Sequence, residues 1–204
     1  MKPTPRSVLL RVALAALCAA AAGCALLSPP KAQVEKATLD KVPLELPHAG
    51  TGSGTLLVFP PRASPVYDTR QMAYRTRPHE VAYFSEREWG ETPSQMLNPL
   101  LVKTLEATHA FNAVLVPPYT GRYTRALRTD ILELIQDFTT QPATVVLTLR
   151  FQLTDYEAKQ AIATKEISVR EPLQRRASYA GVVAANDATA EALRQMAEFV
   201  LAQN

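Results

Sequence analysis

Strict alternation of apolar and polar residues over residues 145–154 constrains the fold more than any other feature of this sequence. Leu147, Leu149, Phe151 and Leu153 are separated by Thr148, Arg150, Gln152 and Thr154. Alternation with a period of two is typical of a β-strand with one buried face. A polar turn at 157–160 follows, and residues 161–170 return as the hairpin partner of this strand. The apolar face of such a hairpin needs a second layer to cover it.

Other segments predict further strands, each bounded by glycine or proline. They are a weak edge strand within Val34–Val42, a buried strand at 55–60, two candidates at 66–77 and 79–85 that Pro78 separates, and a strand at 112–116 before Pro117. Residues 127–138 are ambiguous. Their apolar positions fit one face of a helix, and they also fit a central strand that is buried on both faces.

Two helices are indicated. Thr92, Pro93 and Gln95 have the residue types of a capping box with proline at the first helical position. Leucines then recur at helical spacing up to Leu105. Pro99 leaves two alternatives, because either the helix bends there or it begins there with Asn98 as its cap. A second helix is predicted from about Val183, with an apolar stripe from Leu193 to Leu201. Strands on both sides of one helix and a closing helix predict an α/β fold, a two-layer domain of a mixed β-sheet with two main helices.

The N-terminus is typical of a bacterial lipoprotein signal. Residues 1–11 are basic, residues 12–22 form an apolar run too short to span a bilayer, and Ala21-Ala22-Gly23 leads to Cys24. This pattern predicts a signal peptide over 1–23, lipid attachment at Cys24 through a thioether, and a tether with an edge segment over 24–54 before a domain at 55–204. A plain secretory signal is the alternative. Ala25, in place of Asp, predicts the inner leaflet of the outer membrane.

Removal of residues 1–23 takes away three of 22 basic residues and leaves 19 bases against 19 acids. The mature chain is therefore neutral, which argues against a nucleic-acid partner. With Cys18 removed and Cys24 lipidated, no thiol is left for a disulfide, a metal or a nucleophile.

No combination of residues in the sequence predicts an active site. The histidines His48, His79 and His109 lack zinc-ligand spacing, so no metal or other cofactor is expected. The glycine-rich stretch 50–54 precedes a strand, whereas a phosphate loop or a nucleophile elbow is followed by a helix. We therefore expect a protein that is not an enzyme.

Residues 74–93 concentrate aromatic and charged side chains around the only tryptophan. Two interpretations of this stretch are possible. In the first, the rings pack the sheet against the first helix, with Trp89 covering the core. In the second, they form a recognition surface, since tyrosine, tryptophan and arginine dominate binding hot spots. The candidate partner-binding residues are Tyr74, Arg75, Tyr83, Phe84 and Trp89.

This stretch resembles the ABC-type transport auxiliary lipoprotein family, which includes PqiC-like proteins. The resemblance lies in Tyr74-Arg75 at a strand end, in Glu80-Val81 followed by Tyr83, and in Trp89-Gly90-Glu91-Thr92-Pro93 opening a helix. It extends over nearly all of residues 34–203. It implies a fold similar to the N-terminal domain of TolB, and it implies that 127–138 is a strand.

The resemblance also implies a function. Such lipoproteins work beside an inner-membrane permease, an ATPase and a periplasmic mammalian-cell-entry (MCE) domain protein in lipid transport between the two membranes. The chain would dock the MCE protein from the outer membrane as a homo-oligomer, anchored by acyl chains such as palmitate. A lipoprotein that binds the cell wall or the Tol–Pal machinery is the alternative, because fold alone does not separate these functions.

Overall fold

The computed structural model describes residues 33–48, 50 and 52–203. Apart from Gln33, these belong to one compact unit, Val34–Asn204. The predicted signal peptide and the predicted lipid attachment at Cys24 lie outside the described residues. The strands are β1 (Glu35–Ala37), β2 (Thr55–Val58), β3 (Arg62–Ala63), β4 (Gln71–Arg75), β5 (Ala82–Trp89), β6 (Ala113–Leu115), β7 (Arg125–Asp137), β8 (Thr144–Asp155) and β9 (Gln160–Pro172). The helices are α2 (Pro93–Ala107) and α3 (Ser178–Leu201).

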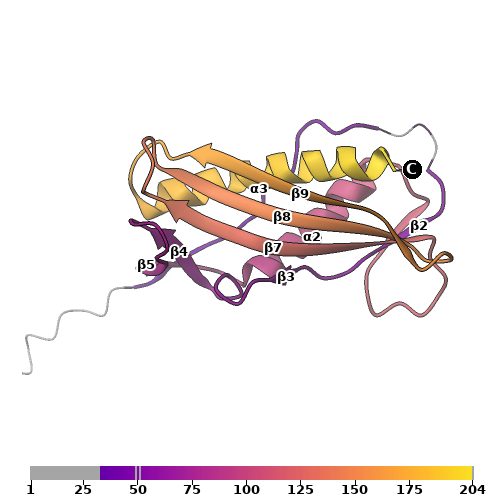
Figure 1. The fold of residues 1–204 in the computed structure, drawn as a ribbon, viewed down its shortest axis with the longest axis horizontal. Coiled ribbons are helices and arrows are strands. Elements are labelled where there is room, and N and C mark those ends of the chain that lie inside the picture. The colour runs from indigo at the N-terminus through magenta and orange to yellow at the C-terminus, as the bar shows by residue number, and fades with distance from the viewer. Residues whose placement is uncertain (1–32, 49, 51, 204) are drawn as a thin grey trace, which may run out of the picture. The chain divides into compact units, whose positions relative to one another are not determined.

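The strands β7, β8 and β9 form a long antiparallel meander (Figure 1). Pairing of β7 with β8 runs from Arg125 opposite Asp155 to Asp137 opposite Thr144. β8 pairs with β9 from Thr144 opposite Pro172 to Asp155 opposite Gln160, which confirms the predicted hairpin at 145–170. The ambiguous segment 127–138 is a strand, as the resemblance implied. Its helix-like pattern arises because β7 is buried on both faces along much of its length.

The other edge of β7 carries three short parallel strands placed one after another. β2 pairs with the start of β7, β3 with its middle and β4 with its end. Beyond them, β6 pairs with β2, and β5 and then β1 extend the sheet from β4. β7 is thus the central strand on which two sets of shorter strands are assembled.

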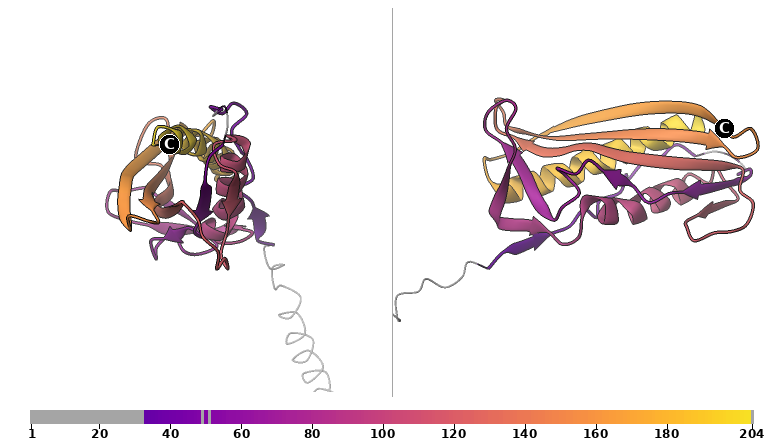
Figure 2. Two further views of the ribbon diagram at one scale, coloured as in Figure 1. Left: turned by 90° about the vertical axis from the view of Figure 1, so that its right-hand side faces the viewer. Right: turned by 60° about the horizontal axis from the view of Figure 1, so that its bottom comes forward.

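Both helices pack against one face of the sheet, which gives the predicted two-layer α/β fold. α3 lies along β8 and β9, and α2 lies beside α3 against β6 and β3 (Figure 2). The alternating apolar residues of β8 point into the same core as both helices, for example Phe151, Leu105 and Met196. The residues between them on β8, such as Arg150, point to the opposite face.

The capping box places the start of α2 as predicted. The Thr92 hydroxyl accepts a hydrogen bond from the Gln95 N–H, and the Gln95 side chain accepts one from the Thr92 N–H. Pro93 is the first helical residue, and Pro99 lies inside the helix. The alternative start at Asn98 is therefore wrong.

Some element boundaries and one burial pattern differ from the sequence prediction. α3 begins at Ser178, five residues before Val183, because small residues let it continue against the sheet. In the segment 66–77 only 71–75 form a strand, because the N–H groups of Tyr67 and Asp68 both bond to the Ser64 carbonyl in a turn. β8 is buried on both faces near Val146, where Ala73, Ile135 and two tyrosines form a second small cluster.

The predicted boundary at residue 55 differs from the compact unit, which begins at Val34. Ala37 and Leu39 are buried in the main core, so the described residues between 34 and 48 pack onto the sheet and α3. Among the residues that the structure describes, neither helix combines the length and the apolar content needed to span a bilayer.

Candidate partner-binding surface

The five candidate residues of the aromatic stretch lie on β4 and β5, beside the carboxyl-terminal end of β7. Neighbouring residues on a strand point to opposite faces. Tyr74 and Phe84 therefore share the face that the helices cover, and Arg75 and Tyr83 share the other. The stretch does not form one continuous surface.

On the helix-covered face, Tyr74, Phe84 and Phe138 form an aromatic triad. The ring centroids of Tyr74 and Phe84 are 4.5 Å apart, and Phe138 meets both edge-on at 6.2 and 6.4 Å. The Arg176 guanidinium lies 5.0 Å from the Phe138 ring centroid and donates a hydrogen bond to the Phe138 carbonyl. The three rings are half-buried, so their exposed edges remain at the surface.

On the opposite face, Arg75 bonds to two carboxylates of β7, Glu133 at 3.0 Å and Asp137 at 2.6 Å. Burial raises the pKa of Asp137, but hydrogen bonds from Arg75 and Thr139 outweigh it and lower that pKa to about 2. The Tyr83 hydroxyl donates to the Val66 carbonyl at 3.0 Å. Burial and then the charge of Glu133 raise the pKa of the neighbouring Tyr67.

Trp89 is buried, with 3% of its surface exposed, and it packs in the main core at the end of β5. The backbone N–H of Trp89 donates a hydrogen bond to the Arg70 carbonyl at 2.7 Å. The packing interpretation therefore describes Trp89. In this position its indole ring cannot contact a partner, because residues of the core surround it.

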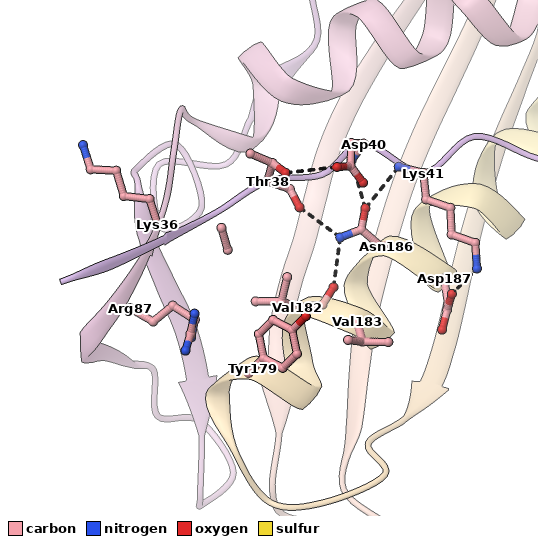
Figure 3. A pocket seen from close by; sticks show the side chains of 11 residues that line it. Lys36, Thr38, Asp40, Lys41, Arg87, Tyr179, Val182, Val183, Asn186 and Asp187 are labelled. Carbon is pink, nitrogen blue, oxygen red and sulfur yellow. Dashed lines mark hydrogen bonds and ion pairs between the residues drawn. The ribbon is translucent and has the colours of Figure 1, made fainter.

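A groove of about 520 Å³ lies next to these strands, between the segment Lys36–Lys41 and the first half of α3 (Figure 3). Tyr179 and Val183, one turn apart on α3, line it and are 53% and 42% exposed. Arg87 of β5 places its guanidinium 5.3 Å from the Tyr179 ring centroid and forms an ion pair with Glu35. The groove thus has an apolar strip with an arginine stacked on its aromatic end.

Asn186 fixes the wall of this groove. Its side-chain oxygen accepts hydrogen bonds from the N–H groups of Asp40 at 2.9 Å and Lys41 at 3.1 Å, and its nitrogen donates to the Thr38 and Val182 carbonyls (Figure 3). Lys41 also forms an ion pair with Asp187. The segment that follows β1 is thereby clamped onto α3.

The charged side chains of this region are largely satisfied within the domain. A carboxylate partner is present for each of Arg75, Arg87 and Lys41. In the described part of the chain, no group of three histidine, cysteine or acidic residues is suited to hold a metal ion. His48 and His109 stack on each other at 5.9 Å. What this surface offers is a shaped, partly apolar groove that can take up a protein side chain.

The comparisons with known proteins place this fold. The family model of the ABC-type transport auxiliary lipoprotein component matches residues 38–197. The chain belongs to this family. No curated protein sequence matches the auxiliary lipoprotein.

Solved structures share the fold of the auxiliary lipoprotein at low sequence identity. The XCC0632 protein of Xanthomonas campestris, of the DUF330 family, has a TM-score of 0.72 and 18% identity, covering 84% of this chain and 96% of that chain. An uncharacterised protein has a TM-score of 0.63 and 13% identity, covering 81% and 99%. The hypothetical protein CT253 of Chlamydia trachomatis has a TM-score of 0.50 and 10% identity, covering 74% and 98%. At these identities the likeness concerns the fold alone.

The contribution of α3 to the groove was missed from the sequence. Tyr179 and Val183 precede or begin the predicted helix, so their i, i+4 spacing on one face was not recognised. The sequence did contain a pattern that could have indicated this surface. Two large apolar residues lie one turn apart on the helix face opposite a buried, alanine-rich stripe, and such an exposed apolar pair is typical of a contact surface.

Proposed function

We propose that the auxiliary lipoprotein is anchored in the outer membrane through Cys24 and docks the periplasmic MCE protein of an intermembrane lipid transport system. The observation that carries the proposal is the family match over residues 38–197. In this role the domain is a non-catalytic adaptor between a membrane anchor and a transport complex that contains a permease and an ATPase.

The sequence Ala21-Ala22-Gly23-Cys24, which is typical of a lipoprotein signal, supports the proposed anchor. Two or three acyl chains hold a protein stably in a bilayer, since each buried CH₂ contributes about 0.8 kcal/mol. Only residues 25–33 separate Cys24 from the folded unit at Val34. The connection therefore cannot exceed about 36 Å even when fully extended, and the domain works close to the membrane that holds it.

The docking surface that we propose combines the groove with the exposed edges of the neighbouring aromatic triad. Tyr179 and Val183 would contact the partner directly, because they are exposed apolar side chains that line the groove. Arg87, whose side chain is 15% exposed, would support the Tyr179 ring through its stacked guanidinium. Tyr74 and Phe84 would contribute their ring edges, while Arg75, Tyr83 and Trp89 would hold the two strands in place. A protein side chain that enters the groove would be stabilised by burial of its apolar surface and by contact with the arginine.

The first test is affinity purification of the lipidated protein from cross-linked native membranes, followed by mass spectrometry. We expect an MCE-domain protein and its permease to be enriched. Enrichment of cell-wall synthases or Tol–Pal components would replace the transport function with the alternative.

The second test concerns the anchor. Cys24→Ser should leave the protein unprocessed or soluble, and Cys18→Ser is the matched control that should fractionate with the outer membrane like the wild type. If Cys24→Ser still fractionates with the outer membrane, the lipid anchor at Cys24 is wrong.

A further inference from the structure

Two loops at the amino-terminal end of β7 expose apolar and aromatic side chains together. We call them the distal tip: residues 116–124, which join β6 to β7, and residues 156–159, which join β8 to β9. Val116, Tyr119 and Tyr156 are exposed by 44%, 41% and 43%. Ile162, close behind the second loop on β9, is exposed as well.

The two loops are joined to each other and to the sheet. The Tyr156 N–H donates to the Thr124 carbonyl at 3.0 Å, and the rings of Tyr123 and Tyr156 are 4.3 Å apart. Thr124 in turn exchanges hydrogen bonds with Thr55 of β2 through its hydroxyl and its N–H. The tip therefore presents its side chains from a hydrogen-bonded base.

Inside the first loop, Tyr119 folds over Gly121. Its hydroxyl donates to the Arg122 carbonyl at 3.4 Å, and a Cβ on Gly121 would lie 2.3 Å from the Tyr119 hydroxyl oxygen. Glycine is thus required there for the tyrosine to take this position.

Exposed apolar side chains that cluster on a folded protein mark contact sites. Tyrosine is favoured at such sites because it combines a large apolar ring with a hydroxyl and loses little conformational entropy on binding. The tip has this composition, and it protrudes, so it suits insertion into an apolar depression of a partner.

The tip lies at the far end of the sheet from the point where the chain enters the domain (Figure 1). β1 joins the sheet through β5 and β4, and Tyr74 of β4 is level with Gln136 of β7. Gln136 is eleven positions after Arg125, the first residue of β7. At about 3.3 Å per residue this is about 36 Å.

We propose that the distal tip is a second docking surface, which binds an apolar face of the periplasmic protein subunit of the transport system. This inference rests on the proposed function. If Cys24 lies in the bilayer and the sheet stands upright above Val34, the tip would reach further into the periplasm than the rest of the domain, where that subunit is met.

A bilayer is the less favoured occupant of the tip. Turning the tip towards the membrane with the sheet upright would raise Val34 by about 36 Å. That equals the full reach of the connection between Cys24 and Val34, so this orientation needs every residue of the connection extended. A protein partner away from the membrane needs no such extension.

The experiment places a photo-cross-linking amino acid at Tyr119, at Tyr156 and, as a control, at Lys165. Lys165 is exposed as well, but it lies in the middle of β9 opposite Phe151, outside the tip, the groove and the aromatic triad. We expect the MCE subunit to be cross-linked in cells from Tyr119 and Tyr156 and not from Lys165. Cross-links from the tip to lipid alone, or to a second copy of this chain alone, would overturn the proposal.

A binding measurement completes the test. The double variant Tyr119→Ser/Tyr156→Ser should weaken binding of the purified MCE subunit by about tenfold or more, while Lys165→Ser should leave it unchanged. Tyr156→Lys is a second variant that leaves the Tyr119 loop intact, and an unchanged melting temperature shows that each variant is folded. If wild type and tip variants bind equally, the tip is not a docking surface although the proposed function stands. If the wild type binds no transport subunit, both proposals fail.

Discussion

At the residue scale, the pair of Arg75 and Asp137 shows how charge is held inside the sheet. Asp137 is buried, and its pKa is lowered to about 2 because hydrogen bonds from Arg75 and Thr139 outweigh the effect of burial. A carboxylate whose pKa is lower in the folded than in the unfolded state stabilises the fold above the unfolded pKa. That stability is lost as the pH falls through the folded pKa.

We therefore expect the wild type to lose stability between about pH 4 and pH 2, and Asp137→Asn to lose less over this interval. Urea unfolding at a series of pH values measures this. Glu80→Gln is the control, because Glu80 pairs with Arg77 at an exposed site and such pairs contribute little. Equal pH profiles for wild type and Asp137→Asn would contradict the prediction.

Trp89→Ala tests the buried position of the only tryptophan. Removing a core tryptophan costs about 3–5 kcal/mol, which corresponds to a melting temperature lower by about 10 °C. Tyr179→Ala, at the exposed edge of the groove, should change the stability by less than about 1 kcal/mol. A small effect of Trp89→Ala would show that Trp89 does not support the core.

At the element scale, Pro99 removes one backbone hydrogen bond from the interior of α2. It lies within the helix, is exposed, and has no N–H to donate to the Gln95 carbonyl. We expect Pro99→Ala to raise the free energy of unfolding by about 1–3 kcal/mol. Pro93→Ala is the matched control with the opposite sign, because Pro93 is the first helical residue and is buried.

The contact of α3 with β7 depends on Gly181. A Cβ there would lie 1.9 Å from the side-chain Cδ of Gln136, which is buried and donates to the Ser178 carbonyl. Gly181→Ala should lower the free energy of unfolding by about 1–3 kcal/mol. The loss should be smaller in a Gln136→Ala background, where the space for the new methyl group is free. Gly90→Ala should be tolerated, since its nearest atom would be 3.5 Å away. Equal costs of Gly181→Ala in both backgrounds would contradict this account.

These elements also show how far the sequence predicts the fold. The alternation of β8 identified a strand because one face of it meets solvent over half its length. β7 was ambiguous because burial on both faces removes the period that distinguishes a strand from a helix. β3 was not expected at all, since two residues carry no period.

The candidate surface was harder to predict than the fold. The stretch 74–89 was singled out for its composition, and composition does not tell a buried ring such as Trp89 from an exposed one. Tyr179 and the tyrosines of the distal tip were missed because each becomes part of a surface only through neighbours far away in the chain. Tyr123 and Tyr156, for example, meet because β7 and β8 pair at Arg125 and Asp155.

At the scale of the whole molecule, residues 24–204 include 19 basic and 19 acidic residues. A neutral domain gains little from long-range electrostatic attraction. We expect the affinity for the MCE subunit to change less than about threefold between 50 and 500 mM NaCl. Titrations at both salt concentrations measure this, and a loss of affinity of tenfold or more would show that charge dominates docking.

The clamp at Asn186 has a mechanical consequence. If acyl chains hold Cys24 and a partner holds the distal tip, any change in the spacing of the two membranes pulls on the chain at Val34. The first structure under tension is the three-residue pairing of β1 with β5, and behind it the clamp ties residues 38–41 to α3. Stretching would peel β1 from its edge and stop at the clamp, while β7 and the strands on both sides of it keep their pairing. Under such a load the edge of the sheet would detach first, and the core would keep its packing.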